Sequence, residues 1–234
     1  MNGDARNERA FAAVEAMLAQ MRPREDAHAR TELLRRHFGS AAALFQAGAP
    51  ALERLGLRPA DALLLSRMPE LARCMRRARF DRRPYIGTLR AASPYLAANF
   101  HGLQLERFYL FCIDRQGRLK ARVLLQEGTE DGALFSLKAM LAQVVRVEPY
   151  AVLVSHNHPG RTLRPSQEDI HCTQEALRAL SVVGIPLLDH VIIAGEQAVS
   201  LRDNGFIPAR AWLAQHPNHR LLAHWLDGAP EIAD

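Results

Sequence analysis

The hydrophobic pattern of the sequence changes near residue 90, and this change limits the possible folds. Before it, apolar residues recur at the spacing of amphipathic helices, and after it short strand-like runs alternate with helical stretches. Two of these runs, "YAVLVSH" and "LLDHVIIAG", are almost entirely apolar, which is typical of buried strands, and the helical stretch "PSQEDIHCTQEALRALSVVG" separates them. The pattern predicts an α/β sandwich of a sheet with flanking helices, preceded by a small all-helical domain.

Residues 1–86 are expected to form the helical domain. "TELLRRHFGSAAALFQA" predicts one helix that ends at Gly39 and a second helix that is capped by Ser40. Proline suits the first turn of a helix, and three prolines are placed at such positions: Pro50, Pro59 and Pro69. The stretch "DRRPYIGTLRAASP" then interrupts the helical pattern and is expected to be a linker.

The α/β domain is expected to span residues 87–208. It begins with a short helix, "SPYLAANFHG", for which Ser93 is the expected N-cap. "RFYLFCID" and "LKARVLLQEG" predict two strands of a hairpin joined by the turn "RQGR". "LFSLKAMLAQVVRVEP" predicts an amphipathic helix, and "AVSLRD" predicts a strand that closes the sheet. Residues 209–234 are expected to add two short helices as a C-terminal extension.

The composition of the 234 residues indicates a cytoplasmic protein with no membrane partner. Hydrophobic residues make up 48% of the chain, but none of the apolar runs approaches the roughly 20 residues that a membrane span needs. The N-terminal stretch "MNGDARNERAFAAVEAML" carries charges where a signal peptide would need its apolar core. The three cysteines are widely and unevenly spaced, so they do not predict a disulfide framework.

Positive charge is concentrated in the first 83 residues, which hold 16 arginines and 10 acidic residues and so carry a net charge of +6. The densest part, "RCMRRARFDRR", could contact phosphate backbones or an acidic partner. A net charge of only +6 over the whole segment favours a solvated helix end followed by a linker. DNA as a partner is therefore a weak hypothesis.

The stretch "LVSHNHPGRTLRPSQED" places candidate metal ligands at the end of a strand and the start of a helix. His156 and His158 are two residues apart, so they point to the same side of an extended backbone. In "PSQED", Ser166 can cap a helix whose first turn contains Asp169. Two imidazoles and one carboxylate with an open fourth position are typical of catalytic zinc sites. A surface histidine pair and an ordinary helix cap explain the same residues, and spacing alone leaves both interpretations open.

The pattern His-x-His-x7-Ser-x2-Asp resembles the JAMM motif of the JAB/MPN metalloprotease fold. The wording "HNHP…PSQEDI" followed by "GIPLLDHVIIA" is similar to that of the bacterial RadC family, and the resemblance covers residues 88–207. It implies a cytidine-deaminase-like sandwich around a mixed sheet, with a zinc ion held by His156, His158 and Asp169. The segment before residue 88 more loosely resembles the helical region that precedes this domain in RadC proteins.

The resemblance also implies a reaction, the hydrolysis of an amide or isopeptide bond in a protein or peptide substrate. A glutamate from an earlier strand should act as general base towards the zinc-activated water, and Glu106 occupies the expected position, with Glu127 as the second candidate. Glu130 and Glu148 fit less well. Ser166 should hydrogen-bond the developing oxyanion.

A rival interpretation is a non-catalytic scaffold that binds DNA or a protein partner and holds a structural or vestigial zinc. The family's association with DNA repair and recombination is compatible with it. The chain departs from the family pattern in three places. "HNHPGR" replaces "HNHPSG" and places Arg161 beside the site, a Pro-Arg-Glu triplet is missing after "GT", and "LGLRPADALLLS" keeps only Gly56 of a Gly-x-Gly hairpin.

One further histidine lies in a predicted buried strand. His190 follows Asp189 in "LLDHVIIAG" and is expected to be a hydrogen-bonded structural residue rather than a metal ligand. Cys172, three residues after Asp169, is expected to be a small buried hydrophobic residue.

Overall fold

A computed structural model describes residues 2–128, 135–160, 162–208, 213–214, 216 and 218–227. The chain divides into two compact units, Met1–Ala72 and Arg73–Asp234. The hydrophobic pattern had predicted this boundary between residues 86 and 87 instead. The difference arises because residues 73–86 include the end of a helix and a segment that pairs with the sheet of the second unit.

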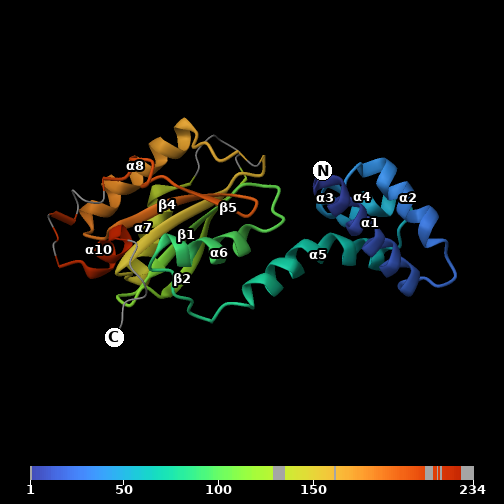
Figure 1. Cartoon of the computed structure of the whole chain (residues 1–234), viewed down its shortest axis with the longest axis horizontal. Helices are drawn as coiled ribbons and strands as arrows, with labels where there is room; N and C mark the ends of the chain where they lie inside the picture. Colours follow the sequence, from blue (N-terminus) through green and yellow to red (C-terminus); the bar gives the residue numbers. More distant parts are fainter. Residues whose placement is uncertain are drawn as a thin grey trace. The chain divides into compact units, whose positions relative to one another are not determined.

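The first unit is helical, as the spacing of its apolar residues indicates (Figure 1). Its elements are α1 (Asn2–Met21), α2 (Ala27–Phe38), α3 (Ala41–Gln46), α4 (Ala49–Arg54) and the first part of α5 (Pro59–Arg77). Both predicted caps are confirmed. Gly39 takes the left-handed conformation after α2, with φ of 68°, and the Ser40 hydroxyl accepts a hydrogen bond from the backbone of Ala43. Phe11, Leu34 and Leu44 are fully buried in the core of this unit.

The expected position of Pro69 was wrong. Pro50 and Pro59 lie in the first turns of α4 and α5, but Pro69 lies in the interior of α5. A proline has no N–H to donate, so the helix runs on with one hydrogen bond fewer. The leucine, alanine and arginine residues on both sides favour the helix strongly enough for it to continue.

The second unit is built on a mixed five-stranded sheet with the strand order β2-β1-β3-β4-β5. The strands are β1 (Arg107–Ile113), β2 (Leu119–Glu127), β3 (Ala151–Asn157), β4 (Leu187–Ala194) and β5 (Gln197–Ser200). β1 pairs antiparallel with both β2 and β3, while β3 and β4 are parallel because a helix connects them. The sheet and its flanking helices confirm the predicted α/β fold.

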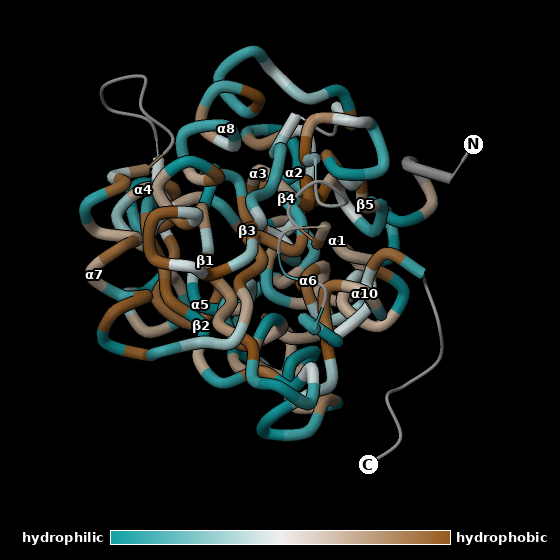
Figure 2. Tube along the Cα trace, turned by 90° about the vertical axis from the view of Figure 1, so that its left-hand side faces the viewer, coloured by the Kyte–Doolittle hydropathy of each residue, from teal (hydrophilic) through white to brown (hydrophobic). Residues whose placement is uncertain are grey.

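Helices cover both faces of this sheet (Figure 1). Tyr109 and Phe111 of β1 contact the aromatic rings of α6 (Leu89–Phe100) on one face. Because side chains alternate along a strand, Phe108 points to the other face, where α7 (Leu137–Val147) and α8 (Gln167–Val182) pack. Every residue of β3 and β4 is buried, and much of the strand trace is coloured as hydrophobic in Figure 2. The sheet is therefore the core that positions the side chains described below.

The expected N-cap of α6 was also wrong. The helix begins at Leu89 and is capped by Thr88, whose hydroxyl accepts a hydrogen bond from the backbone of Ala91. Ser93 lies inside the helix, and its hydroxyl donates to the carbonyl of Leu89. Pro94 made Ser93 resemble a helix start, but a proline in the second turn removes only one hydrogen bond from the helix.

The expected linker and the expected C-terminal extension both pack into the second unit. The backbone N–H of Ile86 donates to Gly117 in the β1–β2 turn, and that of Leu119 donates to Pro84. In the described part of residues 209–234, α10 (Arg220–Asp227) buries Leu222 and Trp225 in the same core. These contacts explain why residues 73–86 and α10 belong to the α/β unit.

Gly117 should be sensitive to substitution because it supports this segment. Its φ of 76° is left-handed, and an added Cβ would lie 2.6 Å from the ring of Tyr85. The Tyr85 hydroxyl in turn forms a hydrogen bond of 2.7 Å with Nε2 of His224. We expect Gly117→Ala to lower the free energy of unfolding by about 2–4 kcal/mol, from backbone strain and overpacking together. Gly195→Ala is the matched control, since Gly195 has a similar φ of 68° but nothing within 4 Å. Urea denaturation of both variants would check the difference, and equal losses would contradict the role of Tyr85.

None of the helices in the described part of the chain is long and apolar enough to cross a membrane.

Candidate metal centre

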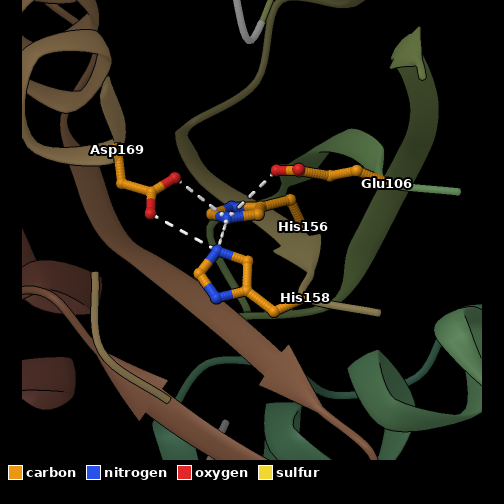
Figure 3. Close-up of side chains that lie close together, drawn as sticks. All are labelled: Glu106, His156, His158 and Asp169. Atoms are coloured by element: carbon orange, nitrogen blue, oxygen red, sulfur yellow. Dashed lines mark hydrogen bonds and ion pairs between the residues drawn. The ribbon is translucent and has the colours of Figure 1, made fainter. Parts of the chain in front are cut away.

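Four side chains from three parts of the second unit converge at one end of the sheet (Figure 3). His156 is the penultimate residue of β3 and His158 follows that strand, while Asp169 lies in the first turn of α8 and Glu106 precedes β1. One ligand atom from each of the four residues lies within 4.8 Å of the other three. The structure therefore brings the three expected metal ligands and the first-choice glutamate together.

Asp169 is held in place by the helix cap that the sequence predicted. Its Oδ2 accepts a hydrogen bond of 2.7 Å from the backbone of Ser166, and the Ser166 hydroxyl accepts one of 3.0 Å from the Asp169 backbone. The cap uses Oδ2 and leaves Oδ1 facing His156, 3.0 Å from its Nε2. Burial alone would raise the pKa of Asp169, but His156, His158 and the Ser166 N–H hold it well below its usual range. The Asp169 carboxylate is therefore ionised.

His158 presents its Nε2 atom to the cluster. Its Nδ1 lies 2.9 Å from the carbonyl oxygen of Thr162, which can only accept, so Nδ1 carries the proton of the neutral ring. Nε2 lies 3.4 Å from Oδ2 of Asp169. The hydrogen bond to Asp169 raises the pKa of His158. A hydrogen bond from the other ring nitrogen to a backbone carbonyl is typical of metal-binding histidines.

His156 is fully buried and lies at the centre of the four residues. Its ring stacks on Phe108, with an interplanar angle of 9°. Its Nε2 lies 2.9 Å from Nε2 of His158, 3.0 Å from Oδ1 of Asp169 and 3.4 Å from Oε1 of Glu106. Two donors bound to one tetrahedral zinc lie about 3.3 Å apart, so the contacts to Nε2 are close to the spacing of ligands around a single ion.

Two oxygen atoms in the cluster indicate that a cation fits there. Oδ1 of Asp169 and Oε1 of Glu106 are buried, and neither has a hydrogen-bond partner. A buried carboxylate oxygen without a partner is costly unless a positive charge compensates it. Nitrogen and carboxylate donors are the set that zinc accepts in proteins, so these residues could hold a metal ion.

The structure distinguishes among the glutamates that were candidates for the general base. The carboxylate of Glu127 pairs with Arg107 at 2.5 Å, and its side chain is 41% exposed. Glu148 takes a left-handed conformation at the end of α7, and Glu130 lies outside the described residues. Glu106 alone of the described candidates is in the cluster. Arg161, the substitution noted beside the histidines, also lies outside the described residues.

Asn157 supports Glu106, a role that the sequence pattern did not predict. The Asn157 side chain accepts a hydrogen bond from the backbone of Arg107 at 2.9 Å and donates one to the carbonyl of Leu105 at 3.1 Å. It thus clamps the main chain on both sides of Glu106 and holds the glutamate beside His156. The signal was present in the letters "HNH", but Asn157 acts on a segment about 50 residues earlier, so no local pattern shows it.

Thr173 also lies behind the site, beside His190, and the sequence pattern did not single it out. The ring of His190 contacts His156 and Thr173, whereas the Asp189 carboxylate accepts from the backbone N–H of His190 and from the hydroxyl of Ser200. The expectation that His190 is hydrogen-bonded rather than a ligand agrees with this geometry, but its ring partner is not Asp189. Cys172 is half-buried and packs against the core, and burial raises the pKa of its thiol.

Metal affinity should depend on pH through His158. Because the pKa of His158 is raised above its ordinary 6.5, a proton occupies the position that a metal needs as the pH falls through that region. Zinc affinity should fall about tenfold per pH unit below the raised pKa and level off above it. Without metal, the protonated His158 beside Asp169 stabilises the fold below pH 6.5, and this contribution is lost as the pH rises through the raised pKa. Chelator competition between pH 5.5 and 8.5 would measure the zinc affinity, and an affinity that stays constant over this range would contradict the expected pH dependence.

Comparison with known proteins points to one family. Residues 86–206 match the family model of the RadC-like JAB domain. A UPF0758 protein of Syntrophotalea carbinolica is 36% identical over 157 residues, which cover 65% of this chain and 67% of that protein. A UPF0758 protein of Paracidovorax citrulli is 33% identical over 178 residues, 76% of this chain and 75% of the relative. One of Vibrio cholerae is 31% identical over 180 residues, 76% and 80% of the two chains. The chain therefore belongs to the RadC family, whose members carry a RadC-like JAB domain.

Proposed function

We propose that this protein is a zinc-dependent hydrolase that cleaves an amide or isopeptide bond in a protein or peptide. The observation that carries the proposal is the convergence of His156, His158 and Asp169 on one point, with the Glu106 carboxylate beside it. The chain resembles the JAB/MPN metalloproteases, and all the donor residues that their chemistry needs are present in it.

Each residue has a separate role in the proposed reaction. His156, His158 and Asp169 would hold the ion. Zinc with three protein ligands supplies Lewis acidity, which polarises a substrate carbonyl and lowers the pKa of water to about 7. Glu106 takes a proton from the attacking water and returns it to the leaving nitrogen. Its side chain is 25% exposed, so it can reach both the buried cluster and a substrate at the surface.

Ser166 can contribute a hydrogen-bond donor to the developing oxyanion. Its hydroxyl oxygen accepts from the backbone of Asp169, so the hydroxyl proton is not used in that contact. The residue is half-buried at the start of α8, where the helix dipole also favours negative charge.

One observation favours a second candidate function, a scaffold with a structural zinc. Oε1 of Glu106 is 3.4 Å from Nε2 of His156, which is close enough for Glu106 to become a fourth ligand and close the site. The arginine-rich segment does not add to this candidate, because Arg76 pairs with Glu196 and Arg83 pairs with Asp114. DNA binding is accordingly not part of the proposal.

Peptide and isopeptide libraries incubated with the full chain would test the proposed hydrolysis. Mass spectrometry should find new amide-bond termini with the zinc-loaded protein, none after chelation, and the same termini again after zinc is restored. Stoichiometric zinc binding with no cleavage anywhere in the libraries would favour the scaffold.

A further inference from the structure

Behind the candidate metal centre, four groups form a continuous chain of short hydrogen bonds. Nδ1 of His156 lies 2.8 Å from Nε2 of His190, and Nδ1 of His190 lies 2.6 Å from the hydroxyl of Thr173. The same hydroxyl lies 2.6 Å from the backbone carbonyl of Asp169. His156, His190 and Thr173 are all fully buried, so water does not compete for these contacts. The chain begins at one proposed ligand and ends at another.

The direction of every hydrogen bond in this chain follows from its last member. A carbonyl oxygen can only accept, so the Thr173 hydroxyl donates its single proton to Asp169. Thr173 must then accept from His190, which places the His190 proton on Nδ1. The His190 ring is fully buried and its two partners are an imidazole and a hydroxyl rather than a carboxylate, so the ring is neutral and its Nε2 is an acceptor. His156 must therefore donate from Nδ1, and in the neutral ring this leaves the lone pair on Nε2, the atom that faces the cluster.

Secondary structure maintains this arrangement. Thr173 lies one helical turn after Asp169 on α8, so its hydroxyl reaches the Asp169 carbonyl within the helix. His190 lies on β4, which pairs with β3 in parallel, and its ring faces the same side of the sheet as that of His156. This chain of hydrogen bonds thus joins the helix that carries one proposed ligand to the strand that carries another.

We infer that Thr173 and His190 are positioning residues, which lock His156 in the tautomer that presents Nε2 to a metal. This inference rests on the proposed function, because it assumes that His156 is a ligand. Without this chain of hydrogen bonds, the proton of His156 could occupy Nε2 and block coordination of the metal. The second partner of a metal-binding histidine typically changes metal affinity by about 10- to 100-fold. Here that partner is a neutral imidazole, which orients His156 without adding negative charge to the site.

The matched variants are Thr173→Val and Thr173→Ser. Valine has nearly the shape of threonine but removes the hydroxyl, whereas serine keeps it. We expect Thr173→Val to weaken zinc binding about 10- to 100-fold in chelator competition, and Thr173→Ser to stay within about threefold of the wild type. Thermal unfolding of the metal-free proteins would show that both variants fold.

Ring ¹⁵N NMR of the metal-free full-length protein at pH 8 provides a readout that is independent of zinc. The wild type should show His156 and His190 protonated at Nδ1, and Thr173→Val should lose this pattern. Protonation of His156 at Nε2 in the wild type would overturn the inference, and so would a Thr173→Val variant with unchanged tautomers and zinc affinity. Zinc binding without hydrolysis would overturn the proposed function alone, whereas a wild type that binds no zinc would overturn both.

Discussion

Replacement of His158 by alanine, or of Asp169 by asparagine, is expected to weaken zinc binding by roughly 3–5 kcal/mol, or about 100- to 5,000-fold in Kd. A zinc site in a protein has an apparent binding free energy of roughly 10–16 kcal/mol, shared among a few ligands, so the loss of one should remove a large part of it. Asparagine is preferred at position 169 because its side-chain oxygen can still accept the hydrogen bond from Ser166 and preserve the helix cap. Asp169→Asn therefore removes the negative charge but keeps the helix cap at the start of α8.

Elemental analysis of purified protein, followed by chelator competition, would measure this loss. The wild type should contain close to one zinc per chain. His171→Ala is the matched control, because His171 is exposed on α8 and is not in the cluster, so its zinc content should equal that of the wild type. A wild type that takes up no zinc under chelator-free conditions would mean that the two histidines and Asp169 form only a polar end of the sheet.

Glu106→Gln should separate metal binding from chemistry. Glutamine keeps the size of the side chain but cannot take a proton, so we expect kcat for amide hydrolysis to fall about 10²- to 10⁴-fold. Zinc affinity should remain within about threefold of the wild type if three protein ligands hold the ion. The rate is measured on a substrate found in the library screen, with zinc content determined on the same samples.

Glu127→Gln is the control for this experiment. It removes a carboxylate that pairs with Arg107 at the sheet surface, and an exposed pair of this kind contributes only about 0–1 kcal/mol. Its kcat and zinc affinity should therefore match those of the wild type. If Glu106→Gln instead lost zinc as severely as Asp169→Asn, Glu106 would be a fourth ligand and the site would be structural.

Local features of the fold could be predicted because they depend on residues only a few positions apart. Gly39 ends α2 and Ser40 starts α3 because each cap uses atoms within one helical turn. Ser166 and Asp169 form the predicted capping box for the same reason. Where two local signals competed, prediction failed: Thr88 rather than Ser93 caps α6, and Pro69 lies inside α5.

The spacing of apolar and polar residues was enough to predict the α/β fold and the helical first unit, and the two-residue spacing of His156 and His158 was enough to put them on one side of the chain. Only the tertiary structure placed Glu106 rather than Glu127 in the cluster, and only it revealed the support from Asn157. Strand pairing decides these contacts, because β1 and β3 lie side by side although about 50 residues separate them along the chain. The physical reason is that a side chain's neighbours across a sheet depend on register, and register is a property of the whole packed core.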